Sequence, residues 1–138
     1  MILPALKRIY YRYIKNLDEL ESKKMNAIGD TCGIVINYKT PDLIKKYLAD
    51  FRYYYPDLHL LIVDNSNFDR STDIIYSVCK KDGNMTLLAN FFNLHHGPGL
   101  HKAIQYIENY FKFALIMDSD IQFHSHGMLE ELKRIVPE

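Results

Sequence analysis

Residues 32–66 read CGIVINYKTPDLIKKYLADFRYYYPDLHLLIVDNS and contain an apolar run, a helical pattern and a second apolar run. The first run, residues 32–36, is short and rich in β-branched side chains, which favours a buried strand. Thr40-Pro41 predicts a helix start, because threonine suits the N-cap and proline is tolerated at the first helical position. The second run is residues 58–63. This order predicts a strand–helix–strand unit.

The same alternation continues along the rest of the chain. Further apolar runs lie at residues 85–89 and 113–117, each preceded by a helical pattern. The runs are nearly continuous in apolar residues, as expected for parallel strands that helices cover on both faces. We therefore predict an α/β fold for residues 31–138: a Rossmann-like, mostly parallel sheet with helices on both faces.

Residues 1–30 form a separate segment with the pattern of an amphipathic helix. Apolar residues recur at steps of three and four: Leu3, Leu6, Ile9, Tyr10, Tyr13, Ile14, Leu17 and Leu20. The opposite face is basic: Lys7, Arg8, Arg12 and Lys15. One interpretation is a helix that rests on anionic lipid as a peripheral membrane contact. The other is a leading helix that packs on its own domain or on a second subunit in a homodimer.

Composition excludes several classes of protein. The chain has 138 residues, with 17 Lys plus Arg balanced by 17 Asp plus Glu, and this neutrality argues against nucleic acid as a partner. Cys32 and Cys79 are too few for a disulfide framework and are expected to be buried thiols. No stretch approaches the roughly 20 apolar residues of a membrane-spanning helix, and no secretory signal is evident. A cytoplasmic location is expected, with membrane association through residues 1–30 as the alternative.

Polar side chains follow each of the four apolar runs. The endings are Asn37-Tyr38-Lys39, Asp64-Asn65-Ser66-Asn67, Asn90 with Asn93, His95 and His96 beyond it, and Asp118-Ser119-Asp120. In an open parallel sheet, ligands bind outside the carboxyl ends of the strands, where the strand order reverses. The sequence therefore predicts a polar ligand site at this edge.

The pair Asp118 and Asp120 is the most informative of these endings. Two carboxylates one residue apart repel each other unless a cation or hydrogen-bond donors offset the charge. Oxygen ligands of this kind suit Mn²⁺ or Mg²⁺, which also take phosphate oxygens from a substrate. Such a metal would neutralise a diphosphate leaving group. The alternative is a strand-end turn in which Asp118 caps the backbone.

Four segments together resemble a GT-A glycosyltransferase of the family 2 type. They are residues 34–38 (IVINY), residues 61–66 (LIVDNS), Asn93 with the Gly97-Pro98-Gly99 helix start, and residues 115–120 (LIMDSD). Their order and rough spacing match the family from residue 31 to the end of the chain. The resemblance implies a truncated GT-A-like fold and a UDP-sugar as the expected donor.

The resemblance also implies a role for each matching residue. Residues expected to line or shape the base and ribose pocket are Ile36, Asn37, Tyr38, Asp64, Asn65 and Ser66, with Asp64 hydrogen-bonded to the base or ribose. Residues expected to border the nucleotide are Asn93, His96, Gly97 and Gly99, the two glycines allowing close backbone approach. Asp118 would face the ribose or the water shell of the metal, and Asp120 would ligate the Mn²⁺ or Mg²⁺ that bridges the diphosphate.

The implied reaction is metal-assisted transfer of a sugar from a nucleotide-diphosphate sugar to the hydroxyl of an unidentified glycan, lipid or protein acceptor. Only 18 residues follow Asp120, so the chain is expected to be the donor-binding half, and no catalytic base is assigned. The alternative is a catalytically incomplete nucleotide-binding or regulatory module that needs a partner or a C-terminal half. A haloacid dehalogenase-type phosphatase is disfavoured, because Gln122 stands where Thr or Val is required.

Overall fold

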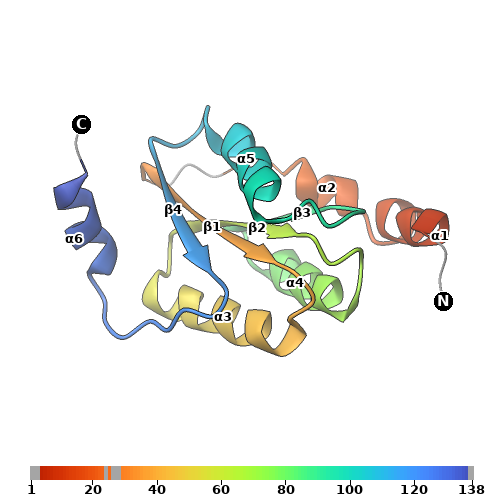
Figure 1. Cartoon of the computed structure of the whole chain (residues 1–138), viewed down its shortest axis with the longest axis horizontal. Coiled ribbons are helices and arrows are strands. Elements are labelled where there is room, and N and C mark those ends of the chain that lie inside the picture. The colour runs from red at the N-terminus through yellow and green to blue at the C-terminus, as the bar shows by residue number, and fades with distance from the viewer. Residues whose placement is uncertain (1–3, 24, 26–28, 137–138) are drawn as a thin grey trace.

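The computed structural model describes residues 4–23, 25 and 29–136, and its centre is a sheet of four parallel strands (Figure 1). The strands are β1 (Thr31–Asn37), β2 (His59–Asp64), β3 (Met85–Ala89) and β4 (Phe113–Asp118). They lie in the order β3-β2-β1-β4, with every neighbouring pair parallel. This architecture confirms the predicted α/β fold.

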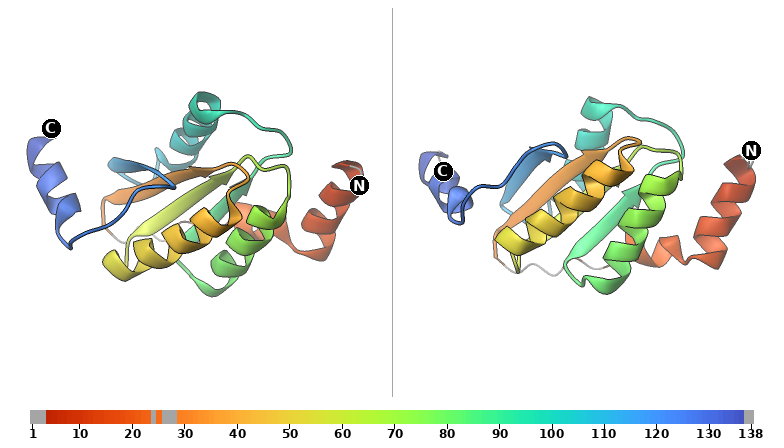
Figure 2. Two further views of the ribbon diagram at one scale, coloured as in Figure 1. Left: turned by 60° about the horizontal axis from the view of Figure 1, so that its bottom comes forward. Right: turned by 90° about the horizontal axis from the view of Figure 1, so that it is seen from below.

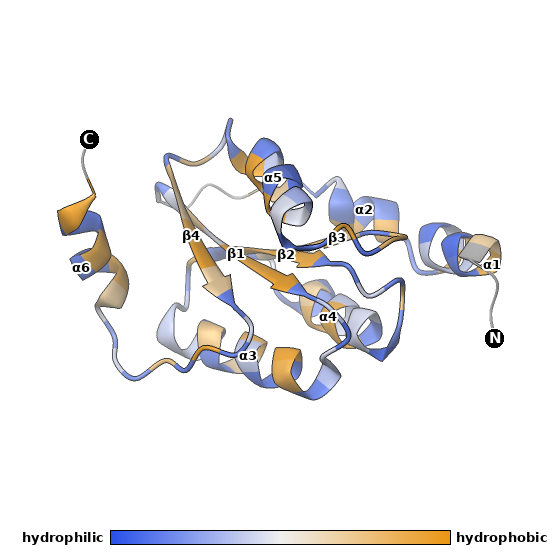
Figure 3. Ribbon diagram, in the orientation of Figure 1, coloured by the Kyte–Doolittle hydropathy of each residue, from blue (hydrophilic) through white to orange (hydrophobic). Residues whose placement is uncertain are grey.

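Helices cover both faces of the sheet. Two helices, α3 (Pro41–Tyr54) and α4 (Arg70–Lys81), lie on one face, and α5 (His96–Ile107) lies on the other (Figure 2). Because successive strand residues point to opposite faces, β1 sends Val35 into the core with α3 and α4 and Ile34 into the core with α5. The strands are strongly hydrophobic along their length, as Figure 3 shows.

The edge strand β4 is less well covered than the other three. Only Met117 is buried among its residues, and Ile116 is 46% exposed. The reason is that α5 packs over β1 and β2 instead of over β4. Beyond β4, the chain ends in α6 (Met128–Ile135), which the final apolar pattern predicts and which buries Leu129. No helix in the described ranges has both the length and the apolar character needed to span a bilayer.

The N-terminal segment is divided into three short helices. These are α1 (Pro4–Ile9), the π-helical turn η1 (Tyr10–Ile14) and α2 (Leu17–Glu21). The expectation of one continuous helix is therefore wrong, because Asn16 adopts a left-handed conformation with φ 56°. Leu17 and Leu20 are buried, and α2 lies along the free edge of β3, where a Glu21 carboxylate oxygen accepts from the Ala89 N–H at 3.1 Å.

The helix starts differ slightly from those expected. Thr40 occupies the N-cap position of α3, but its hydroxyl donates to Asn37 Oδ1 at 2.6 Å and does not cap the helix. The apolar pattern predicts that the next helix begins at Ser71 or Thr72, but α4 begins at Arg70, because the Asp69 side chain accepts from the Ser71 N–H at 2.8 Å. An N-cap residue such as Asp69 lies before the apolar pattern of its helix, so apolar periodicity does not locate it.

The two cysteines are free and buried, as expected, and they lie on opposite faces of the sheet. Cys32 belongs to the core beneath α5, and Cys79 belongs to the core formed with α3 and α4. Burial raises the pKa of each thiol to about 12, so both are protonated and weakly nucleophilic near neutral pH.

Candidate functional site

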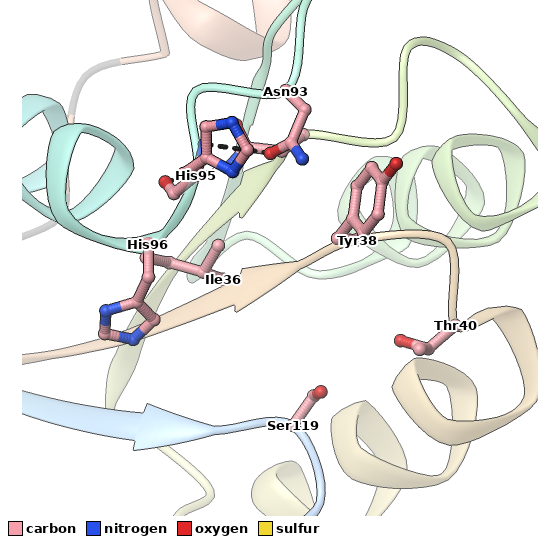
Figure 4. A pocket seen from close by; sticks show the side chains of 8 residues that line it. Ile36, Tyr38, Thr40, Asn93, His95, His96 and Ser119 are labelled. Carbon is pink, nitrogen blue, oxygen red and sulfur yellow. Dashed lines mark hydrogen bonds between the residues drawn. The ribbon is translucent and has the colours of Figure 1, made fainter.

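The strand order reverses between β1 and β4, and a cavity opens at their carboxyl ends. The connections lead from β1 outward to β2 and β3, whereas β4 lies on the other side of β1. Such a reversal leaves a crevice in which α/β proteins bind ligands. The cavity has a volume of about 320 Å³. Its lining residues are Ile36, Tyr38, Thr40, Asn65, Asn93, His95, His96 and Ser119 (Figure 4).

Five of the lining residues belong to the set predicted from sequence: Ile36, Tyr38, Asn65, Asn93 and His96. The structure brings them together from β1, from the turn after β2 and from the start of α5.

Thr40, His95 and Ser119 also line the cavity but were not among the predicted site residues. The polar segments after β3 and β4 contain His95 and Ser119, and Thr40 directly follows the polar segment after β1, so their neighbourhood was detectable. Which side chain of each segment enters the cavity depends on the backbone of the turn.

Three of the predicted residues lie buried beneath the cavity and do not line it. Asn37 Nδ2 donates to Asp64 Oδ1 at 3.0 Å and to Ser66 Oγ at 3.1 Å, and the Thr72 hydroxyl donates to Asp64 Oδ2. Asp64 is 1% exposed. Burial raises the pKa of its carboxyl, while the hydrogen bonds from Ser66, Thr72 and Asn37 act in the opposite direction. This network ties the ends of β1 and β2 together.

Asn65 presents its side chain to the cavity from a fixed position. Its Oδ1 accepts from Asn90 Nδ2 at 2.8 Å, and its Nδ2 donates to the His95 carbonyl at 3.3 Å. Lys102 in turn donates to Asn90 Oδ1. A Cβ on Gly99 would lie 3.2 Å from Asn65 Nδ2, so the glycine permits α5 to approach this amide closely.

The amino end of α5 forms one wall of the cavity through His95 and His96. His95 has φ 62° and ψ 179°, a conformation that non-glycine residues rarely adopt, and the Asn93 side chain accepts from its N–H at 2.8 Å. Across the cavity, Lys39 also has a positive φ of 53°. The first N–H groups of a helix have no partner within the helix, so this end favours an anionic group. Gly97 lies in the first turn of α5 and does not line the cavity.

The two predicted metal-binding carboxylates lie on either side of Ser119. Asp118 is exposed, with Oδ1 3.8 Å from His96 Nε2. Asp120 lines a neighbouring hollow of about 70 Å³ with Lys46 and Asp50, and Ser119 borders both spaces. Within residues 4–23, 25 and 29–136, no three His, Cys, Asp or Glu side chains form a metal-binding group. Asp118 and Asp120 therefore lie next to the cavity without lining it. Ions such as Mg²⁺ are often held by one or two carboxylates together with substrate phosphates.

Comparison with known proteins agrees with this fold. The family model described as Glycosyl transferase family 2 matches residues 32–136. A solved mannosyltransferase from Pyrobaculum calidifontis, in complex with GDP-Man and Mn²⁺, superposes with a TM-score of 0.60 at 18% sequence identity. The superposition covers 91% of this chain and 37% of the mannosyltransferase. None of the curated protein sequences matches the chain. Because the family match runs from β1 through α6 and includes every segment around the cavity, the chain belongs to glycosyl transferase family 2.

Proposed function

We propose that the chain binds a nucleotide-sugar donor in the cavity between β1 and β4, as the donor-binding part of a glycosyltransferase. The observation that carries this proposal is the convergence of polar side chains from the ends of β1, β2 and β4 and the start of α5 around one cavity. The reaction would transfer the sugar to an acceptor hydroxyl with the aid of a divalent metal. Membership of glycosyl transferase family 2 supports it.

Tyr38 and Asn65 are the groups best suited to hold the base. Tyr38 is 48% exposed, so its ring offers a face on which a base can stack. The Asn65 side chain borders the same cavity and carries both a donor and an acceptor. A cavity of about 320 Å³ lies within the ~300–1,000 Å³ range of ligand pockets, and a UDP-sugar is the donor that the sequence resemblance implies.

The amino end of α5 and the carboxylates after β4 are suited to the diphosphate. His96 lines the cavity and lies beside Asp118, while the start of α5 favours negative charge. Asp118 and Asp120 would hold Mn²⁺ or Mg²⁺, which when bound supplies positive charge that stabilises the diphosphate as a leaving group. Ser119, between them, offers a hydroxyl to the cavity.

A second candidate function is nucleotide binding without sugar transfer by this chain alone. The observation that favours it is that the chain spans 37% of the mannosyltransferase that it resembles in fold. Binding of the nucleotide is common to both functions. They differ in whether the chain releases the nucleotide from a nucleotide sugar when an acceptor hydroxyl is supplied.

Calorimetric titration of UDP, GDP and dTDP with and without Mn²⁺ tests the proposal. We expect UDP to bind at least 10-fold more tightly in the presence of Mn²⁺. Asp118→Ala and Asp120→Ala should each remove the effect of the metal without lowering the melting temperature, since both side chains are exposed.

Asp57→Ala is the matched control. Asp57 is another exposed carboxylate, but it lies before β2, at the opposite edge of the sheet. The metal effect should persist in this variant. Nucleotide binding that is independent of metal and unchanged in the Asp118 and Asp120 variants would refute the metal site.

A further inference from the structure

The N-terminal helices carry an apolar surface that faces solvent. It consists of Leu6, Ile9, Tyr10, Tyr13 and Ile14, which are 55%, 50%, 44%, 75% and 67% exposed. We refer to these five residues as the N-terminal apolar surface. They are spaced three and four residues apart, so they occupy one side of α1 and η1.

The other side of the same helices is attached to the domain by polar groups. The hydroxyl of Tyr11, which is buried, donates to Asp73. Lys7 Nζ donates to the Asn67 carbonyl at 3.0 Å. A surface helix normally buries its apolar face and exposes its polar face. Here these polar contacts and the Tyr11 ring, whose centroid lies 4.5 Å from that of Phe68, hold the helices on the domain, so the N-terminal apolar surface is not needed for that purpose.

Arg12 strengthens this polar attachment. Its guanidinium pairs with Asp18 and Glu21 and lies over the Phe91 ring, 5.5 Å from the centroid. Large exposed apolar patches on soluble domains mark interaction sites. The N-terminal apolar surface therefore requires a partner.

The charge around this surface identifies the kind of partner. Arg8 and Lys15 have no carboxylate within 4.0 Å in the part of the chain that the structure describes. Arg8 is exposed, with its guanidinium 5.4 Å from the Phe91 ring centroid, and Lys15 Nζ lies 5.6 Å from the Tyr10 ring centroid. The first acidic residue of the sequence is Asp18. A second copy docked on this surface would bring its own Arg8 and Lys15 near these two cations, which disfavours self-association.

We infer that the N-terminal apolar surface docks the domain on a bilayer of anionic lipid. Leu6 and Ile9 supply side chains for the acyl region, and tyrosines suit the boundary between headgroups and acyl chains. The flanking Lys and Arg side chains reach anionic headgroups, each adding to the attraction. A neutral bilayer lacks this electrostatic attraction. The docking surface lies on the β3 side of the sheet, separate from the cavity between β1 and β4 (Figure 1).

Co-sedimentation with lipid vesicles tests this inference on the full chain. We expect binding to vesicles of phosphatidylcholine with phosphatidylserine, and at least 10-fold weaker binding to phosphatidylcholine alone. The triple variant Leu6→Ser, Ile9→Ser, Tyr13→Ser should lose at least 10-fold in partitioning. The double variant Arg8→Gln, Lys15→Gln should lose about 10-fold on anionic vesicles only. Both variants should melt within a few degrees of the unmodified protein, because four of the five replaced side chains are exposed and Lys15 is half-buried.

The matched control replaces three equally exposed apolar residues elsewhere: Tyr53→Ser, Phe92→Ser, Tyr110→Ser, at 69%, 74% and 47% exposure. This variant should bind vesicles as the unmodified protein does. The inference is overturned if the unmodified protein does not sediment with anionic vesicles, or if the control loses as much binding as the Leu6 triple variant. A dimer in ultracentrifugation that the Leu6 triple variant abolishes, without vesicle binding, would assign the surface to a second copy instead.

Discussion

At the scale of single residues, the position of Asn65 connects the core of the sheet to the cavity. Its amide is held by Asn90 on one side and by the His95 carbonyl on the other, and Lys102 extends this network. A side chain with both of its polar atoms engaged keeps one orientation. A ligand that contacts Asn65 therefore meets a group already in place.

Gly99→Ala should disturb this arrangement. The added Cβ would lie 3.2 Å from Asn65 Nδ2 and 3.6 Å from Ile36 Cδ1, so the amide or the helix must shift. We expect a loss of about 1–3 kcal/mol in the free energy of unfolding, as overpacking usually costs. Nucleotide affinity should also fall. Denaturant unfolding and calorimetry measure the two effects.

Gly97→Ala is the matched control for that prediction. A Cβ at Gly97 has no atom within 4 Å, and the position lies in the same first turn of α5. Stability and nucleotide affinity should stay close to those of the unmodified protein. Equal losses in the two variants would show that the contact with Asn65 does not account for the effect, since alanine favours a helix over glycine.

Sequence reasoning located the edge of the sheet that holds the cavity but could not separate the residues that line it from those beneath it. Tyr38 and Asn37 are adjacent polar residues after an apolar run, yet Tyr38 faces the cavity and Asn37 is buried. Successive side chains of a strand point to opposite faces of the sheet. Whether a side chain is buried or lines the cavity therefore depends on where the helices cover these faces. That placement is a tertiary property, and apolar periodicity does not encode it.

At the scale of elements, α2 protects an exposed strand edge. An edge strand presents unpaired N–H and C=O groups, and α2 lies beside the free edge of β3. The Glu21 carboxylate makes two contacts: one oxygen accepts from the Ala89 N–H, and the other pairs with Arg12. The same side chain thus links β3 to the helices that carry the N-terminal apolar surface.

Glu21→Ala should destabilise the domain. It leaves the Ala89 N–H without its acceptor and Arg12 with one carboxylate fewer, and we expect a loss of about 1–3 kcal/mol. Glu19→Ala is the control, because Glu19 is an exposed acid of the same helix and should change stability by less than about 0.5 kcal/mol. Urea unfolding compares the two variants. Equal losses would contradict the edge-protecting role of Glu21.

The elements themselves were largely predictable, and the N-terminal break was not. Every strand lies within one or two residues of its apolar run, because buried parallel strands need continuous apolar residues. In the N-terminal segment the apolar spacing continues through Asn16 without interruption, so the sequence predicts one helix. Contacts with the domain, such as the Tyr76 hydroxyl donating to the Lys15 carbonyl, accompany the break and are absent from the local pattern.

At the scale of the whole molecule, alternating strands and helices predicted a parallel sheet but not its order. The position of β4 beside β1, opposite β2, creates the crevice in which the cavity lies. No local pattern states which edge a returning strand joins.

The stability of the whole domain should fall in mild acid because of His59. Its side chain is fully buried at the start of β2, with Nε2 2.9 Å from Thr86 Oγ1. Burial, with Lys23 and Arg52 nearby, lowers the pKa of His59 from 6.5 to about 4. Between these values the unfolded chain binds a proton that the folded chain does not. The contribution is therefore fully present above pH 6.5 and is lost as the pH falls toward 4.

The size of this effect is about 2 kcal/mol between pH 7 and pH 5, from the linkage between pKa and stability. His59→Gln keeps a group able to bond to Thr86 but cannot titrate, so its free energy of unfolding should fall less over the same interval. Urea titrations at several pH values measure both slopes. Identical slopes would mean that other groups govern the acid sensitivity.

The location of Cys32 and Cys79 on opposite faces of the sheet gives the molecule two internal reporters. A thiol-modifying reagent reaches Cys32 only when the α5 layer separates from the strands, and it reaches Cys79 only when the α3 and α4 layer does so. Equal modification rates would mean that the layers open together, whereas unequal rates would identify the layer that opens first. A nucleotide bound against the start of α5 should slow the modification of Cys32 more than that of Cys79 whenever the α5 layer opens alone.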